Sequence, residues 1–259
     1  MDVTRCPVPT ATRAPDGETN AYLIGTDRAI LVDPAARTDE LDRMVDARSV
    51  EHVLVTHTHP DHVGAVASYA DETGATAWAR RGRTDRFRAE TGRRPDRTFS
   101  PGTTIPIGED SVRVLDAPGH AVDHVGLEVG PDGPILCGDC AVAEGSVVVG
   151  APEGDMRAYV TTVRRLWAID PPALYPGHGP TIESSRRTLE RLLSHRHDRE
   201  RRIEAAVAAG AATLDGILEV AYEKDLTGVS DLARATVAAH LEKLAVEDRL
   251  EWDGTRATI

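Results

Sequence analysis

The segment that most constrains this 259-residue chain runs from Thr56 to His62 and reads THTHPDH. It follows the apolar run 53–55, which predicts a buried strand. Three imidazoles and one carboxylate on a single loop would repel or desolvate one another without a cation between them. Imidazole and carboxylate are ligands that suit Zn²⁺, with iron and manganese as further candidates. The segment therefore predicts a metal site built from His57, His59, Asp61 and His62.

Three further ligand-type residues follow predicted strands, and each lies beside a glycine. They are His120 after Gly119, Asp139 after Gly138, and His178 between two glycines. Glycine lets the backbone approach a crowded centre. Each position alone is a weak signal, but the three in this order after the first segment predict one composite metal site.

This combination resembles the metallo-β-lactamase superfamily over residues 18–182. The resemblance implies an α/β fold, a four-layer αββα sandwich with two metal ions, zinc being the favoured ion, at one edge of its sheets. It implies one metal on His57, His59 and His120, a second on Asp61, His62 and His178, and Asp139 between them. A hydroxide held by both ions would be the nucleophile, with Asp61 at the reacting centre.

Two neighbours are candidates for supporting the ligands. In relatives, the position of Asp33 looks like a carboxylate that orients a metal ligand. His124, four residues after His120, is predicted either to orient a ligand or to relay a proton as a catalytic group. The alternative for both is an ordinary polar residue.

The periodicity predicts alternating strands and helices up to about residue 182, typical of an α/β fold. Strands are expected at 21–24, 29–32, 53–55, 76–78, 112–115, 125–129 and 134–136, and helices at 38–47, 63–73 and 156–168. Helices at 184–209, 214–225 and 230–247, followed by a hairpin at 250–259, predict a small winged-helix domain. The expected domains are 1–190 and 191–259.

A narrower resemblance extends over nearly the whole chain. The segments 118–124, 138–145, 174–180 and 195–200, the last leading into the winged helix, resemble the β-lactamase-like-2 family. That family includes a mitochondrial endoribonuclease and many uncharacterised hydrolases, so this resemblance does not fix the substrate.

The charge balance favours some partners over others. The net charge is −12 and only two basic residues are lysines, which favours adaptation to high salt over an acidic protein of a GC-rich genome. Residues 194–259 carry 9 basic and 13 acidic side chains, so duplex DNA is not expected as a partner. The predicted winged helix would instead cover the active-site groove or form a homodimer. No signal peptide or membrane span is evident, which predicts a cytoplasmic protein without a membrane partner.

Two local features bear on the substrate. Residues 80–97 contain 8 arginines and 3 acids, so Arg80, Arg81 and Arg83 are candidate contacts for an anionic substrate, or else part of a solvated surface. The segment 139–155 lacks Lys and Arg, which disfavours glutathione thioesters. The pair Cys137 and Cys140 is interpreted as two buried thiols, with a redox or zinc role as the alternative.

The sequence thus predicts a hydrolase of an ester, thioester or phosphodiester. The alternatives are an endoribonuclease acting on single-stranded RNA, a mononuclear-iron persulfide dioxygenase, and a winged-helix regulator with a vestigial metal domain.

Overall fold

The computed structural model describes residues 1–223 and 226–259, which form two compact units. The first unit comprises residues 1–117, 123–144 and 171–185. The second comprises residues 118–122, 145–170 and 186–259.

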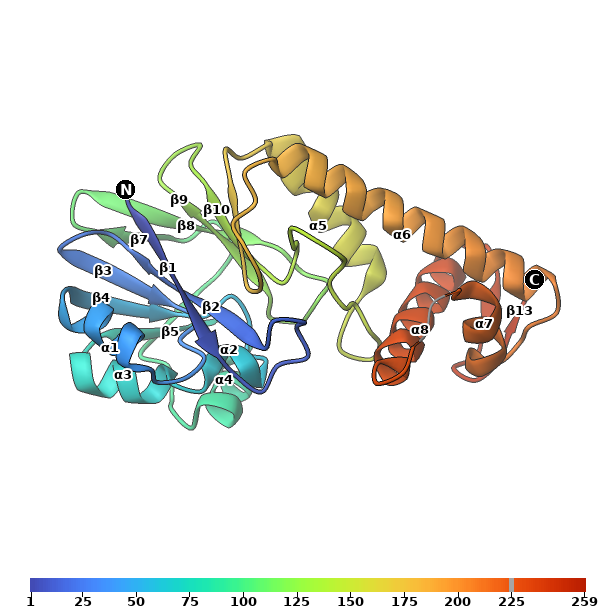
Figure 1. The fold of residues 1–259 in the computed structure, drawn as a ribbon, viewed down its shortest axis with the longest axis horizontal. Coiled ribbons are helices and arrows are strands. Elements are labelled where there is room, and N and C mark those ends of the chain that lie inside the picture. Colours follow the sequence, from blue (N-terminus) through green and yellow to red (C-terminus); the bar gives the residue numbers. More distant parts are fainter. Residues whose placement is uncertain (224–225) are drawn as a thin grey trace. The chain divides into compact units, whose positions relative to one another are not determined.

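Two β-sheets form the first unit (Figure 1). The first sheet has its strands in chain order: β1 (Val3–Pro9), β2 (Glu18–Ile24), β3 (Arg28–Val32), β4 (Ser49–Leu54), β5 (Thr76–Arg80) and β6 (Arg97–Phe99). The second has the order β11-β10-β9-β8-β7, from β7 (Thr104–Ile107), β8 (Asp110–Asp116), β9 (Val125–Val129), β10 (Ile135–Gly138) and β11 (Leu174–Pro176). Strands β3 to β6 pair in parallel, so the ends of β3 and β4 lie at the same edge.

Alternation along the strands explains why both faces of the first sheet are buried. Leu23 and Leu31 belong to one apolar cluster, together with side chains of the helices on that face. Ile24 and Ile30 belong to another cluster, which includes residues of the second sheet. The helices of the first unit are α1 (Asp39–Asp46), α2 (Pro60–Val63), α3 (Val66–Thr73) and α4 (Thr84–Thr91). Helix, sheet and sheet therefore stack as layers around two cores.

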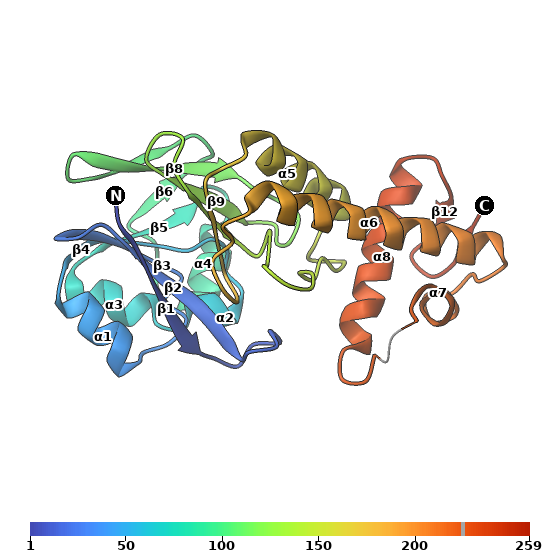
Figure 2. The same ribbon diagram turned by 45° about the horizontal axis from the view of Figure 1, so that its top comes forward.

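The second unit is mainly helical (Figure 2). It contains α5 (Met156–Ile169), α6 (Ser185–Ala208), α7 (Leu214–Ala221), α8 (Ser230–Val246) and the hairpin of β12 (Glu251–Trp252) and β13 (Ala257–Thr258). Ile203, Ile217, Val237 and Leu241 share one buried cluster with the hairpin residue Ala257. The order of helices and hairpin is the one expected, and its assignment as a winged helix stays a prediction.

The mixed α/β fold is confirmed, with local differences from the expected elements. The single helix expected at 63–73 is interrupted between α2 and α3, where the Ala65 amide donates to the Pro34 carbonyl oxygen at 2.9 Å instead of to a helix carbonyl. The helix expected at 214–225 ends at Ala221, and the last two residues of that prediction lie outside the described residues. Among the helices of the described chain, none is both long enough and apolar enough to cross a membrane.

A buried ionic cluster in the second unit predicts sensitivity to acid. Burial by itself raises the pKa of Glu200, but His240 and Lys243 outweigh it and lower that pKa to about 2; the Lys243 ammonium lies 2.8 Å from Glu200 Oε2. Because the folded pKa is below the unfolded value, the stabilisation is present above about pH 4.5 and is lost as pH falls toward 2. Glu200→Gln is expected to lower the unfolding free energy at pH 7 by roughly 1–3 kcal/mol and much less at pH 3. Urea unfolding at the two pH values measures this, and an equal loss at both would contradict it.

The net charge of −12 predicts that salt stabilises the fold. Mobile cations screen repulsion between like charges, and at molar ionic strength this screening acts within about 3 Å. The melting temperature is expected to rise by roughly 5–10 °C between low and molar KCl. Calorimetry at increasing KCl tests this, and a flat or falling melting temperature would rule out salt adaptation.

Candidate metal centre

The loop between β4 and α3 brings four of the predicted ligands to the edge where the parallel strands end. His57 follows the end of β4, His59 occupies the position before α2, and Pro60 begins that helix, where its missing N–H costs no hydrogen bond. Asp61 and His62 then lie in the single turn of α2. His57 and His62 are buried, whereas Asp61 is partly exposed.

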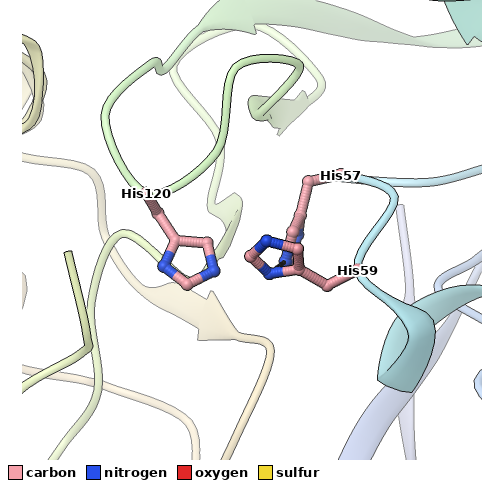
Figure 3. Close-up of side chains that lie close together, drawn as sticks. All are labelled: His57, His59 and His120. Atoms are coloured by element: carbon pink, nitrogen blue, oxygen red, sulfur yellow. Dashed lines mark hydrogen bonds between the residues drawn. The ribbon is translucent and has the colours of Figure 1, made fainter. Parts of the chain in front are cut away.

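All seven predicted ligands fall into three overlapping groups. Within each group, the donor atoms lie within 4.8 Å of one another. The groups are His57, His59 and His120; His57, His62 and Asp139; and Asp61, His62 and His178. Figure 3 shows the imidazoles of the first group facing a common space. Since His57 and His62 each belong to two groups, the donor set is continuous.

Three of the histidines are oriented through Nδ1. His62 Nδ1 lies 3.0 Å from Asp33 Oδ2, His178 Nδ1 lies 2.7 Å from the Glu18 carbonyl oxygen, and His120 Nδ1 lies 2.7 Å from the Val148 carbonyl oxygen. An Nδ1–H that donates to an oxygen fixes the tautomer and leaves the Nε2 lone pair for a metal. Among the described residues, the buried His62 Nε2 has no hydrogen-bond partner, as expected of an atom that binds an ion.

The His57 and His59 rings face each other through one nitrogen each. His57 Nε2 lies 2.9 Å from His59 Nδ1. Two imidazole lone pairs at this distance repel each other unless a proton or a cation lies between them. The pair therefore fits a cation bound by both rings.

Asp139 directly follows β10, and its carboxylate lies between two of the histidines. Its Oδ1 is 3.7 Å from His62 Nε2 and its Oδ2 is 3.4 Å from His178 Nε2. The absence of a side chain at Gly177 makes this possible, because a Cβ there would be 2.3 Å from Asp139 Oδ1. Asp61 Oδ2 lies 3.6 Å from the same His178 nitrogen.

The carboxylates make this centre strongly attractive to positive charge. Burial alone lowers the pKa of His178, but Asp139 outweighs it and raises the pKa to about 9. The pKa of His62 is likewise raised, because Asp139 and Asp33 outweigh the effect of burial. Five imidazoles and two carboxylates in this field fit divalent metal ions.

Asp33 holds both the loop and one ligand. Its oxygens accept hydrogen bonds from the Thr56 amide and the Thr56 hydroxyl, each at 2.7 Å, in addition to the contact with His62. Asp33 has a φ of +50°, a left-handed conformation that Asp tolerates better than most residues. The carboxylate thus fixes the start of the ligand loop and the orientation of His62.

Of the two roles expected for His124, the hydrogen bonds favour orientation over proton relay. Its buried Nε2 accepts a hydrogen bond of 3.0 Å from the amide of Asp139. Its ring centroid lies 5.0 Å from that of His57. His124 therefore supports Asp139 and packs against a second ligand.

One supporting network was not expected from the sequence. The Thr58 hydroxyl, between two ligand histidines, donates to Asp123 Oδ2 at 2.6 Å and accepts from Arg86 Nε at 2.8 Å. Asp123 precedes His124 in the segment that carries the family resemblance, but its partner lies 65 positions earlier in the chain. Only the folded structure reveals this pairing.

The three candidate arginines differ in their surroundings. Arg80 donates to Asp116 Oδ1 at 2.7 Å and to the His124 carbonyl oxygen at 3.0 Å, so it ties two strands' ends together. Arg81 and Arg83 are exposed, and Arg83 lines a small cavity together with His57.

Cys137 and Cys140 are buried free thiols, as interpreted from the sequence. Burial raises the pKa of both, so they stay protonated. A protonated, buried thiol is a poor nucleophile and a poor metal ligand.

Comparison with known proteins decides the family. The sequence profile of the Metallo-beta-lactamase superfamily matches residues 14–178, a span that includes all seven predicted ligands. The chain belongs to the metallo-beta-lactamase superfamily. This membership agrees with the mixed α/β fold and with the candidate metal-binding groups, and it indicates a hydrolase-type function.

Individual relatives agree with this membership. The chain is 30% identical to a Drosophila melanogaster protein named beta-lactamase-like protein 2 homolog, over 90% of this chain and 84% of that protein. A metallo-beta-lactamase family protein from Thermus thermophilus has a similar structure, with a TM-score of 0.75 and 24% identity over 99% of this chain and 98% of that one. A third protein, TTHA1623, solved in a di-iron-bound form, shares 27% identity at a TM-score of 0.55 over 71% of this chain and 98% of its own.

Proposed function

We propose that this metallo-beta-lactamase superfamily protein hydrolyses an ester, thioester or phosphodiester with the help of two metal ions. The observation that carries the proposal is the orientation of the histidines. His62, His120 and His178 each engage Nδ1 with an oxygen, which directs Nε2 to the donor set. Such preorganisation is expected of a working metal site rather than a vestigial one.

The residues divide into two ligand sets that share one carboxylate. His57, His59 and His120 would hold one ion, and Asp61, His62 and His178 the other. Asp139, which forms a donor group with His57 of the first set and His62 of the second, would be shared. When bound, the ions would supply a nucleophile from water at neutral pH and polarise the bond to be cleaved.

Zinc is the ion that we propose for the site, with iron as the alternative. Five imidazoles and two carboxylates suit Zn²⁺, although the same ligand types also suit iron. The di-iron-bound form of TTHA1623 makes iron the alternative to test here. A single iron per chain would instead favour the dioxygenase reading.

The protein's own residues would prepare the site for reaction. Asp33 holds His62, and His124 holds the amide of Asp139, so both ligands are fixed before substrate arrives. Thr58, held by Asp123 and Arg86, fixes the turn between His57 and His59. Rigid ligands lower the reorganisation needed in the transition state.

A substrate panel at high KCl tests this function. It compares p-nitrophenyl acetate, an acyl thioester, a lactone, bis(p-nitrophenyl) phosphate and single-stranded RNA on metal-loaded protein. Metal-dependent turnover of at least one that is lost with a chelator and restored by Zn²⁺ is the expected result. Turnover that is indifferent to the chelator would overturn the proposal.

The exposed arginines predict an effect on substrate capture. Arg81→Gln with Arg83→Gln is expected to raise KM for an anionic substrate by a few-fold with little change in kcat, because exposed charges contribute equally to ground-state and transition-state binding. Arg80 is left intact, since it links Asp116 to the His124 backbone. Steady-state kinetics on an anionic and a neutral ester measure the effect.

The neutral ester is the control for the arginine variant. Its kinetics should be indifferent to the change. Equal losses on both esters would assign the two arginines to the fold, and unchanged kinetics on both would assign them to the solvated surface.

A further inference from the structure

The second unit contains a cavity of about 450 Å³ that lies apart from the predicted ligands in the sequence. Its walls come from α5, α6, α8 and the turn after α8. The volume is in the range of pockets that hold small molecules. Its lining is unusually basic for this acidic chain: five Arg or Lys residues and one histidine surround it, against two glutamates.

Both glutamates are already paired with cations of the cavity wall. Glu200 lies 2.8 Å from Lys243 and 3.3 Å from Arg249, and Glu247 lies 2.7 Å from Lys243. They therefore neutralise the cations of α8 and of the turn that follows it. These glutamates do not neutralise the arginines of α5 that line the cavity.

Arg157 and Arg164 are these remaining cations. Both are exposed, and no carboxylate of the residues that the structure describes pairs with either guanidinium. His197 of α6 lies with Nε2 3.3 Å from Arg164 Nη2, so the neutral imidazole accepts from the guanidinium and holds it at the cavity. Positive charges gathered without counter-charges repel one another, and a bound anion relieves that repulsion.

The spacing of the two arginines indicates the size of the anion. They are seven residues apart on α5, which is two helical turns and about 10 Å along the axis. Two arginine side chains would have to converge to contact one orthophosphate, whereas a chain of two or three phosphates can contact both guanidinium groups without that convergence. Guanidinium groups bind phosphate oxygens in a bidentate manner, which suits such a chain.

We infer that the cavity between α5, α6 and α8 binds a small ligand that carries two or more linked phosphates, through Arg157 and Arg164. Among the described lining residues Val160 is the only apolar side chain, and the one aromatic ring, the His197 imidazole, is engaged by the Arg164 guanidinium. The linked phosphates are therefore recognised rather than a nucleobase. Inorganic oligophosphate and nucleoside phosphates are two sources of this one chemistry.

Isothermal titration with tripolyphosphate tests the site on the full-length, metal-free protein. The KCl concentration is the lowest at which circular dichroism shows wild type to be folded, because salt screens exposed charges. Tripolyphosphate is expected to bind about tenfold or more tightly than orthophosphate, and ATP no more tightly than tripolyphosphate. Arg157→Gln with Arg164→Gln should weaken tripolyphosphate binding about tenfold or more.

The matched control replaces two arginines of the same helices that do not line the cavity, Arg165→Gln with Arg202→Gln. It removes the same charge and should keep wild-type affinity. The His59→Ala variant, which lacks a predicted metal ligand, should also keep it, so failure here and failure of the proposed hydrolase are distinguishable. Equal weakening in both arginine pairs, no weakening in the first, or loss of binding in His59→Ala would overturn the inference.

Discussion

Asp139→Asn is expected to reduce hydrolysis by roughly a thousandfold and to lower the metal content of the protein. The substitution keeps the shape of the side chain but removes the charge of the carboxylate that lies between His62 and His178. Metal-assisted catalysis is worth several kcal/mol of transition-state stabilisation, and about 4 kcal/mol corresponds to a factor of about a thousand. Steady-state rates and elemental analysis on the same preparations measure the two effects.

Asp132→Asn is the matched control for this variant. Asp132 is an exposed residue in the turn between β9 and β10, and its φ of +53° is one that Asn tolerates well. Its replacement should leave rate and metal content unchanged. An Asp139→Asn protein that keeps full metal content and more than about a tenth of wild-type activity would remove Asp139 from the ligand set.

The second large effect is expected at Asp33→Asn. The Asp33 carboxylate accepts from the amide and hydroxyl of Thr56 and contacts His62 Nδ1, and an amide side chain has only one oxygen to offer. Partners that orient a metal ligand typically contribute 10–100-fold to affinity or activity. We therefore expect metal affinity or activity to fall by about that factor.

The design of this variant separates orientation from folding. Asn tolerates the left-handed backbone of Asp33, so the backbone is not strained by the change. Competition with a chromogenic chelator gives the metal affinity, and thermal unfolding without metal gives the stability. A loss of stability with unchanged metal affinity would assign Asp33 to the fold alone.

The sequence predicted the ligands because they are local or come at strand ends beside glycine. His57, His59, Asp61 and His62 lie on one loop, where no other reading accounts for their crowding. The later three ligands required the family resemblance to be joined to them. The structure brings all seven into connected groups.

The elements that the sequence missed are largely edge strands that contain proline. β1 holds Pro7 and Pro9, and β7 holds Pro106, and both strands lie at the edges of their sheets. Proline removes a donor from the ladder, which is tolerated at an edge but weakens the strand signal in the sequence. The short β6 gives too few residues for a clear alternation.

Long-range pairings were the other part that the sequence did not reveal. Arg80 was a candidate substrate contact, yet its guanidinium donates to Asp116, 36 residues away. Thr58 and Asp123 form their hydrogen bond across 65 residues. Charge and spacing along the chain carry no information on such partners, because the fold alone brings them together.

The metal content of the wild-type protein tests the two-metal centre. The protein would be stripped with a chelator, reloaded with excess Zn²⁺, freed of unbound ions by gel filtration, and analysed for zinc and iron together with protein concentration. Because two ligand sets would share Asp139, we expect about two ions per chain in wild type and fewer in His59→Ala and in Asp139→Asn. One ion per chain in fully loaded wild-type protein would contradict the two-metal centre.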